Sequence, residues 1–126
     1  MAYRLPGGIP LWVCWIPVVW VVSVPLGFTP TPQWDRVHLV PFSDPADKVT
    51  DLAANLLLFV PFGFSFVRRP RALVWLPLAA GVVSAIAEIT QLFSTVRYPS
   101  GTDLVYAIAG ALAGGVVSLF TRRPSR

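Results

Sequence analysis

Four apolar runs alternate with shorter polar segments along the chain. They cover residues 9–28, 51–67, 72–93 and 102–120, and each is close to the ~20 residues that a transmembrane helix needs. The pattern therefore predicts an all-α integral membrane protein: a single domain over residues 1–126, with four transmembrane helices in a compact bundle.

The first run has a rival interpretation as a signal peptide, because the basic residue Arg4 precedes it. Against this, the run is longer than a usual signal-peptide core, is rich in tryptophan and lacks a small-x-small cleavage site. We therefore expect residues 9–28 to form a retained span, kinked at Pro17 and Pro25.

Composition agrees with a membrane location. Hydrophobic residues make up 55% of the chain and charged residues 13%, and the mean hydropathy is +0.65. The net charge of +4 comes from short basic clusters between apolar runs, which indicates topology and not nucleic-acid binding. With Cys14 and His38 the only residues of their types, we expect no disulfide within the chain, no metal site and no cofactor.

The basic residues also predict the orientation of the chain. Seven arginines lie at the amino end, between the second and third runs, and after the fourth run: Arg4, Arg68, Arg69, Arg71, Arg122, Arg123 and Arg126. The other side carries three basic residues among five aspartates: Arg36, Lys48 and Arg97, with Asp35, Asp44, Asp47, Asp51 and Asp103. The positive-inside rule thus puts both termini in the cytoplasm and makes segments 29–50 and 94–101 face outward.

Polar residues inside the apolar runs share helix faces. Gly81, Ser84, Glu88 and Gln91 recur at spacings of three and four, as do Asp103, Ala107, Gly110 and Gly114. A carboxylate in a membrane span is costly and often functional. We predict one polar pocket near the outer face, lined by residues from three spans and a loop: Asn55, Glu88, Gln91, Arg97 and Asp103.

The same residues also allow a purely structural interpretation. Glu88 would then pair with Arg97, and Asn55 and Gln91 would be hydrogen bonds between helices. Glu88 and Asp103 would alternatively form an acid/base pair, if their surroundings separate their pKa values. Gly110 and Gly114 form a G-x-x-x-G step, which predicts close helix packing within the chain or in a dimer.

Several short motifs occur in a characteristic order. Val37–Phe42 reads VHLVPF, and a glycine-rich segment, residues 110–114, lies near the carboxyl end. Between them come D-x-x-x-N-x-x-x-F-x-P-x-G and S-x-x-x-E-x-x-Q-x-F, formed by Asp51, Asn55, Phe59, Pro61 and Gly63, and by Ser84, Glu88, Gln91 and Phe93; Arg97 and Asp103 follow. In this order they resemble the VanZ-like family of small bacterial membrane proteins.

The resemblance implies a multi-pass protein of the bacterial inner membrane, in a family named after a member that confers resistance to the glycopeptide teicoplanin. This chain departs from the family at two positions. The family often has asparagine in place of His38, and commonly has one in place of Ala107. Ala107 removes a polar group from the predicted pocket.

We therefore expect the pocket to bind an envelope lipid, a lipid-linked headgroup or a lipoglycopeptide-like ligand, with a possible link to glycopeptide resistance. The first alternative is an intramembrane enzyme that modifies a lipid or cell-wall precursor through Glu88 and Asp103. The second is a structural or partner-binding subunit, whose oligomeric state the sequence leaves open. A transporter ranks last, because the inner halves of the spans are almost free of polar groups.

Overall fold

The protein is described here from a computed structural model of the 126-residue chain. It describes all residues except 1–9, 24–26, 38–39, 41–48, 94–98 and 123–126, and it leaves the side chains of residues 21–23, 36 and 49–52 undescribed. The elements are α1 (Leu11–Ser23), the short 3₁₀ helix η1 (Trp34–Arg36), α2 (Val49–Phe66), α3 (Ala72–Gln91) and α4 (Gly101–Thr121). No strand occurs in these described parts, so the prediction of an all-α fold is confirmed.

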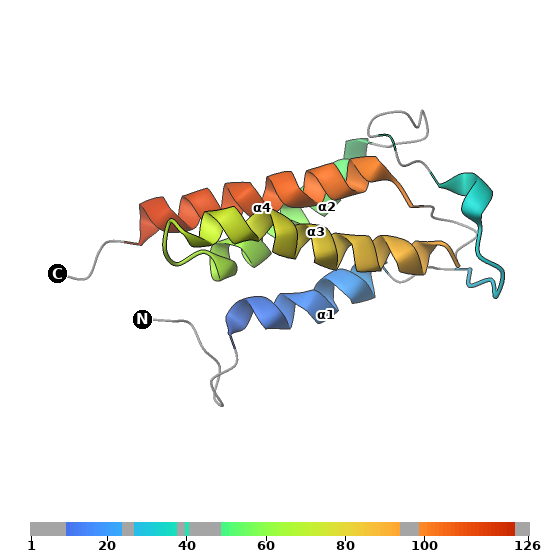
Figure 1. The fold of residues 1–126 in the computed structure, drawn as a ribbon, viewed down its shortest axis with the longest axis horizontal. Helices are drawn as coiled ribbons and strands as arrows, with labels where there is room; N and C mark the ends of the chain where they lie inside the picture. Colours follow the sequence, from blue (N-terminus) through green and yellow to red (C-terminus); the bar gives the residue numbers. More distant parts are fainter. Residues whose placement is uncertain (1–9, 24–26, 38–39, 41–48, 94–98, 123–126) are drawn as a thin grey trace.

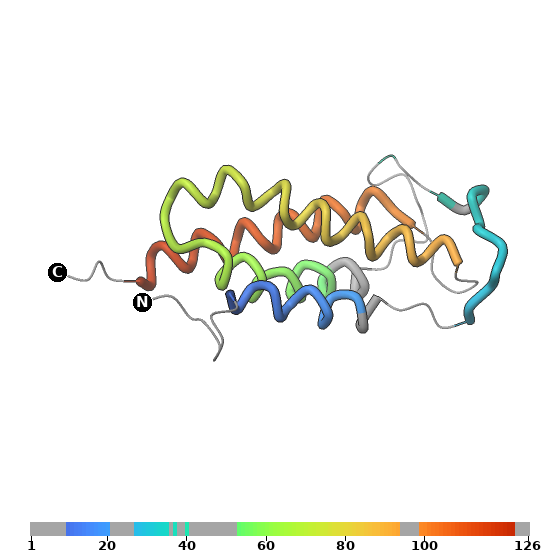
Figure 2. The backbone as a smooth tube through the Cα atoms, turned by 60° about the horizontal axis from the view of Figure 1, so that its bottom comes forward, coloured from blue at the N-terminus to red at the C-terminus, as the bar shows by residue number. Residues whose placement is uncertain are grey.

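The four α-helices run up and down along one long axis (Figure 1). α1 and α3 point one way, and α2 and α4 point the other way, so α2 and α4 lie parallel to each other. The most extensive contact in the bundle is between these two parallel helices, while α1 packs on α2 and α3 (Figure 2). Because successive helices alternate in direction, the start of α4 and the end of α3 meet at the same end of the bundle, beside η1.

Glycines allow α2 and α4 to touch through their backbones. A Cβ atom on Gly110 would collide with the carbonyl group of Leu56, and one on Gly114 with that of Val60. α2 makes the reciprocal contact, because a Cβ on Gly63 would collide with the carbonyl of Ala111. The G-x-x-x-G step of α4 therefore packs inside the chain, against α2.

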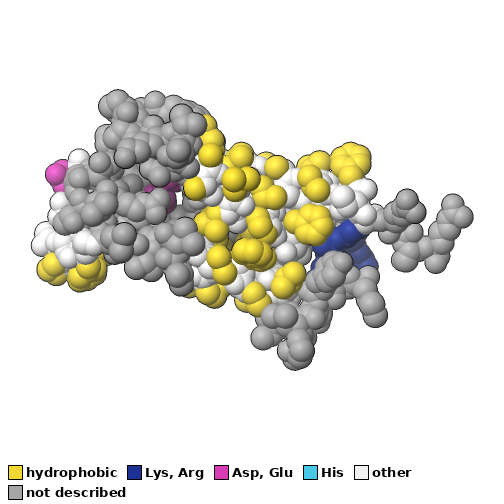
Figure 3. Space-filling view, turned by 180° about the vertical axis from the view of Figure 1, so that it is seen from behind, with side chains coloured by type: hydrophobic (Ala, Val, Ile, Leu, Met, Phe, Trp, Pro, Cys, Tyr) yellow, Lys and Arg dark blue, Asp and Glu magenta, His cyan; other side chains and the backbone are white. Residues whose placement is uncertain are grey.

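Two helices are long and apolar enough to cross a bilayer, α3 and α4. Only 28% of the apolar window of α3 and 33% of that of α4 are buried inside the bundle, so both helices also present apolar side chains outward. On α3 this surface includes Val74, Trp75, Leu78, Val82, Ile86 and Ile89. Figure 3 shows hydrophobic side chains over the middle of the molecule, with Lys and Arg at one end and Asp and Glu at the other, as expected for a protein that sits in a bilayer.

α1 is shorter than the sequence predicts. It has 13 residues, which corresponds to about 20 Å at the rise of an α-helix, whereas a bilayer core is roughly 30 Å thick. The predicted span up to Phe28 is too long, because the chain after Ser23 is not helical where it is next described, and Gly27 has a φ of 79°. The predicted kink at Pro25 lies outside the described residues.

Aromatic contacts attach α1 to α2. The ring of Trp12 lies 6.1 Å from that of Phe62 and 5.1 Å from that of Phe66, both at edge-to-face angles. Phe62 also contacts Phe59, at 5.9 Å between ring centroids, and both of these side chains are fully buried. Trp12 therefore packs within the bundle, between α1 and α2.

Ser118 of α4 and Arg122, the residue that follows α4, form hydrogen bonds with carbonyl groups at the C-terminal end of α2. The arginines between α2 and α3 lie at this same end of the bundle. The hydroxyl of Ser118 donates to the carbonyl oxygen of Val67 at 2.8 Å, and Nη2 of Arg122 donates to that of Phe64 at 3.0 Å. The guanidinium of Arg122 also lies 5.5 Å from the centre of the Phe64 ring. These bonds satisfy carbonyl groups that the last turn of a helix leaves without intrahelical partners.

At the other end of the bundle, backbone amides of the segment before η1 form hydrogen bonds with carbonyl groups just after the C-terminal end of α3. The amide of Thr29 donates to the carbonyl oxygen of Phe93, and the amide of Gln33 to that of Leu92, both at 2.8 Å. The rings of Phe28 and Phe93 stack beside these bonds. This segment is thereby fixed over the end of α3, where it forms part of a groove described below.

Candidate functional site

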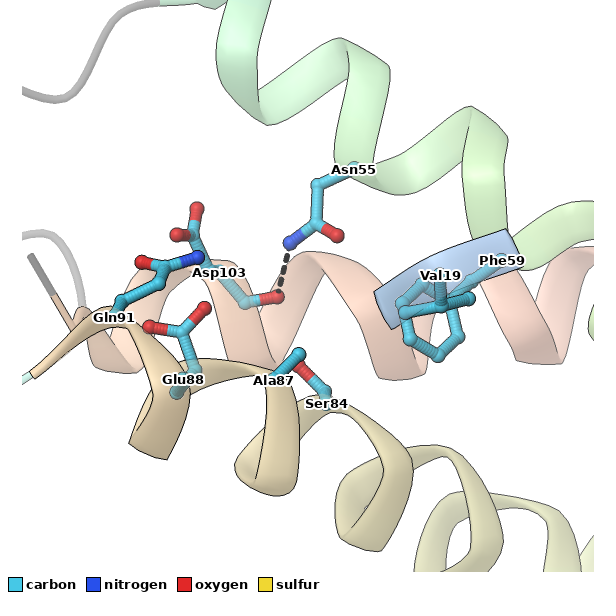
Figure 4. A pocket seen from close by; sticks show the side chains of 8 residues that line it. All are labelled: Val19, Asn55, Phe59, Ser84, Ala87, Glu88, Gln91 and Asp103. Carbon is cyan, nitrogen blue, oxygen red and sulfur yellow. Dashed lines mark hydrogen bonds between the residues drawn. The ribbon is translucent and has the colours of Figure 1, made fainter. Parts of the chain in front are cut away.

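A small cavity lies between the helices near the ends of α3 and α4 that meet beside η1 (Figure 4). Its volume is about 20 Å³, and its lining comes from all four helices: Val19, Asn55, Phe59, Ser84, Ala87, Glu88, Gln91 and Asp103. A cavity of this size holds about one water molecule when polar groups line it. As far as the described residues line it, this polar cavity is therefore water-sized, too small for a lipid headgroup.

Asn55 links α2 to α4 across this cavity. Its Nδ2 donates a hydrogen bond of 2.7 Å to the backbone carbonyl oxygen of Asp103 (Figure 4). The bond is made next to the stretch where α2 and α4 touch through glycines, so the close approach of the two backbones brings donor and acceptor together. Asn55 thus has the interhelical role that the sequence offered as one of its two interpretations.

Glu88 reaches from α3 to the start of α4. Its Oε2 accepts a hydrogen bond of 2.8 Å from the backbone amide of Ser100. Ser100 is the N-cap residue of α4, and its hydroxyl oxygen accepts from the amide of Thr102 at 3.2 Å. A carboxylate at this position interacts favourably with the positive end of the helix dipole, so Glu88 helps to fix where α4 begins.

Gln91 is the most enclosed polar side chain of the cavity, since only 2% of its surface is exposed. Its Oε1 atom has no hydrogen-bond partner among the residues that the structure describes. Figure 4 shows its amide beside the carboxylates of Glu88 and Asp103. A buried amide oxygen without a donor costs about 1–3 kcal/mol, so a water molecule in the cavity that donates to it would be strongly favoured.

Glu88 also lines a second, much larger apolar groove. Its volume is about 520 Å³, and it is lined by α3, α4 and the segment around η1: Pro32, Trp34, Val37, Ala85, Glu88, Ile89, Leu92, Phe93, Pro99, Ser100, Gly101 and Leu104. This is the size range of ligand-binding sites. Within the described parts of the chain, Glu88 is the one residue that lines both the groove and the small cavity.

Four of the five residues predicted for the polar pocket lie around the small cavity, namely Asn55, Glu88, Gln91 and Asp103. The fifth, Arg97, lies outside the described residues, as does the proposed ion pair between Arg97 and Glu88. Ala107 is fully buried in the hydrophobic core and does not line the cavity.

Neither the role of Ser100 at the start of α4 nor the apolar groove was predicted from the sequence. The signal for Ser100 was present, because serine followed by aspartate three residues later, Ser100-x-x-Asp103, is typical of a helix start. The groove had no such signal, since segments far apart in the sequence form its walls. Among the described residues, no group of three His, Cys, Asp or Glu side chains could hold a metal ion.

Fold and site define a small all-helical protein with outward apolar surface, two helices able to cross a bilayer, and a polar cavity beside an apolar groove at one end. The sequence model of the VanZ/LLP1 family matches residues 11–122. The chain therefore belongs to this family, which confirms the resemblance inferred from its motifs. No curated protein and no solved structure matched the chain in the corresponding searches.

Proposed function

We propose that the protein is a four-span protein of the bacterial inner membrane that binds an envelope lipid in the apolar groove beside Glu88. The alternating helix directions and the arginines at one end support four spans with both termini in the cytoplasm. The groove then opens at the depth of the outer leaflet, where envelope lipids present their polar ends.

The observation that carries this proposal is the position of Glu88 in the wall of a large apolar groove. The other described side chains that line it are apolar except for Ser100 and the indole N–H of Trp34, so the groove suits a hydrocarbon chain with a polar end at the carboxylate. Trp34, whose side chain is 69% exposed, flanks the groove, and tryptophan is enriched where a membrane protein meets the lipid–water interface.

The small cavity has a supporting role in this proposal. Because it holds about one water molecule, the ligand's polar end stays on the groove side of Glu88. Asn55, Gln91 and Asp103 then position Glu88 and its water, and do not contact the ligand directly.

A pair of tryptophan substitutions on one helix tests lipid binding. Ile89→Trp adds bulk at a residue that lines the groove, and Val82→Trp adds the same bulk seven residues earlier on α3, outside the groove. Both side chains are largely exposed, at 57% and 51%, so neither change should disturb the core. We expect Ile89→Trp to lose the lipid that copurifies with the protein and Val82→Trp to retain it, as measured by native mass spectrometry. Equal lipid retention in both variants would contradict the proposal.

The second candidate is an intramembrane enzyme acting on a lipid or cell-wall precursor. It is favoured by the contact of Glu88 with both a water-sized cavity and a substrate-sized groove. Lipid mass spectrometry of membranes with wild-type protein and with Glu88→Gln separates the two candidates. A lipid species that appears or disappears only with active wild-type protein supports the enzyme, whereas an unchanged lipid profile supports binding alone.

Membership of the VanZ/LLP1 family extends the proposal to glycopeptide resistance. A lipid-binding protein of the outer leaflet would act on the surface that a lipoglycopeptide such as teicoplanin must reach. We expect expression of the wild-type protein to raise the teicoplanin concentration that inhibits growth, and expression of Ile89→Trp to leave it at the level of the empty vector. No difference between wild type and empty vector would remove this part of the proposal.

A further inference from the structure

We infer that the arginine end of the bundle binds an anionic phospholipid, at a site separate from the groove. The phosphate of this lipid lies against Arg69 and Arg71, and one of its acyl chains lies along the outer face of α3. The inference goes beyond the proposed function, with which it shares only the location of the protein in a membrane.

Positive charge gathers at this end of the bundle without acidic side chains to balance it. Four arginines of the described chain lie here, between α2 and α3 or just after α4: Arg68, Arg69, Arg71 and Arg122. No Asp or Glu occurs at residues 56–87 or after residue 103, and Figure 3 shows Asp and Glu at the opposite end. A ligand that complements the arginine end is therefore an anion.

Arg69 and Arg71 offer side-chain donors for such an anion. Both side chains are exposed, and neither makes a hydrogen bond or an ion pair with another residue that the structure describes. Their backbone carbonyl oxygens accept the amides of Ala72 at 2.9 Å and Val74 at 3.3 Å, which fixes the turn that carries them. A guanidinium presents two parallel N–H donors to a phosphate, so these two arginines together suit a phosphate group.

Exposed apolar side chains continue from Arg71 along α3. Trp75 and Leu78 follow Arg71 by four and seven residues, so the three side chains share one helix face. Trp75 is 64% exposed and Leu78 is 61% exposed. Leu78 lies about 10 Å along the helix from Arg71, which is within the roughly 15 Å depth of one leaflet. This face therefore offers a phosphate site at its polar end and hydrocarbon contact directly beside it.

The combination of charge and apolar surface selects the class of ligand. A soluble phosphate ester, an acidic protein or a nucleic acid would match the arginines but would make no use of Trp75 and Leu78. Phosphatidylethanolamine carries an ammonium group beside its phosphate, and this cation would meet the arginines as a like charge. Phosphatidylglycerol has the phosphate and the acyl chains without the ammonium. The ligand expected here is thus a phospholipid with a net negative charge.

Two phospholipids with the same palmitoyl and oleoyl chains, phosphatidylglycerol and phosphatidylethanolamine, test the headgroup on the purified full-length protein. Native mass spectrometry in detergent measures the fraction bound at each concentration. We expect phosphatidylglycerol to bind about tenfold more tightly. Arg71→Gln should reduce this preference to about twofold, because each arginine near an anionic lipid surface changes binding by roughly fivefold.

Arg36→Gln is the matched control, because it removes the same charge from η1, at the other end of the bundle (Figure 1). It should leave the preference near tenfold. Equal binding of the two lipids by the wild type, or an equal loss of preference in Arg36→Gln and Arg71→Gln, would overturn the inference.

A second pair of variants tests the contact with the acyl chain. Trp75→Ala should weaken phosphatidylglycerol binding about threefold, whereas Trp20→Ala, the same change at a partly exposed tryptophan of α1, should leave it unchanged. Millimolar glycerol 1-phosphate, which has the headgroup without the chains, should not displace the lipid. Displacement by glycerol 1-phosphate, or equal binding by the two tryptophan variants, would overturn a lipid site and indicate a soluble anion.

The groove variant separates this inference from the proposed function. Ile89→Trp, which fills the groove, should keep the tenfold preference for phosphatidylglycerol. Loss of the preference in Ile89→Trp would assign phosphatidylglycerol to the groove, so it would overturn the second site and leave the proposed lipid binding standing. If Ile89→Trp retained its copurifying lipid while Arg71→Gln lost the preference, the second site would stand and the proposed function would not.

Discussion

The contact between α2 and α4 gives the sharpest test of how this fold positions its site. In Gly114→Ala, the new Cβ atom would lie 2.8 Å from the carbonyl carbon of Val60 and 2.9 Å from the backbone nitrogen of Phe64, and closer still to the Val60 oxygen. These atoms belong to the backbone of α2, so no side-chain rotation relieves the collision. The two helices must separate.

Ordinary contacts begin at 3.4 Å, so the helices must move apart locally by more than about 1 Å to clear the Val60 oxygen. A gap of that size removes up to half of the dispersion energy of each contact that it opens. We therefore expect Gly114→Ala to lower the free energy of unfolding by about 1–3 kcal/mol, the usual cost of overpacking. The separation should also lengthen the 2.7 Å bond between Asn55 and the carbonyl of Asp103.

Equilibrium unfolding in mixed detergent micelles, followed by helical circular dichroism, measures this change. Gly81→Ala is the matched control, because its Cβ would lie 3.8 Å from the Cδ1 atom of Ile108, an ordinary contact. We expect the control to change the free energy of unfolding by no more than about 0.5 kcal/mol. If Gly114→Ala were as stable as Gly81→Ala, the backbone contact between α2 and α4 described here would be wrong.

Three further substitutions test individual hydrogen bonds by the same unfolding measurement. Asn55→Leu should cost about 0.6–1.7 kcal/mol, because it removes the bond to the carbonyl of Asp103, and an unchanged stability would contradict that bond. Ser118→Ala should cost about 1 kcal/mol by leaving the buried carbonyl of Val67 unpaired, whereas Thr121→Ala, at an exposed hydroxyl of the same helix, should be nearly neutral. Ser100→Ala should cost about 1 kcal/mol through the loss of the N-cap, and hydrogen exchange should rise at the start of α4; unchanged exchange there would argue against the cap.

The sequence predicted the features that depend on local periodicity. The helical runs 72–93 and 102–120 agree closely with α3 and α4, because apolar residues continue over their whole lengths and the arginines and Pro70 lie at their ends. Helical spacing also placed Glu88 and Gln91 on one face, and the structure has both at one cavity. The family followed from motif order.

Features that depend on tertiary contacts could not be predicted from the sequence. The length of α1 was overestimated, because an apolar run does not show where its helix gives way to the turn at Gly27. One partner of Glu88 is a backbone amide at the start of another helix, and a backbone group carries no sequence signal. The G-x-x-x-G step predicted close helix packing, but it did not show that its partner is the backbone of α2 at Leu56 and Val60.

The central claim is that the groove beside Glu88 selects a lipid from the membrane. Two variants of the protein test lipid selection directly in native membranes. One carries a photoreactive benzoyl-phenylalanine at residue 89, in the groove, and the other carries it at residue 82, on the same helix but outside the groove. After irradiation, mass spectrometry identifies the lipids attached at each position. We expect residue 82 to be attached to lipids in their bulk proportions, and residue 89 to be attached mainly to one enriched species. The same bulk composition at both positions would contradict the claim.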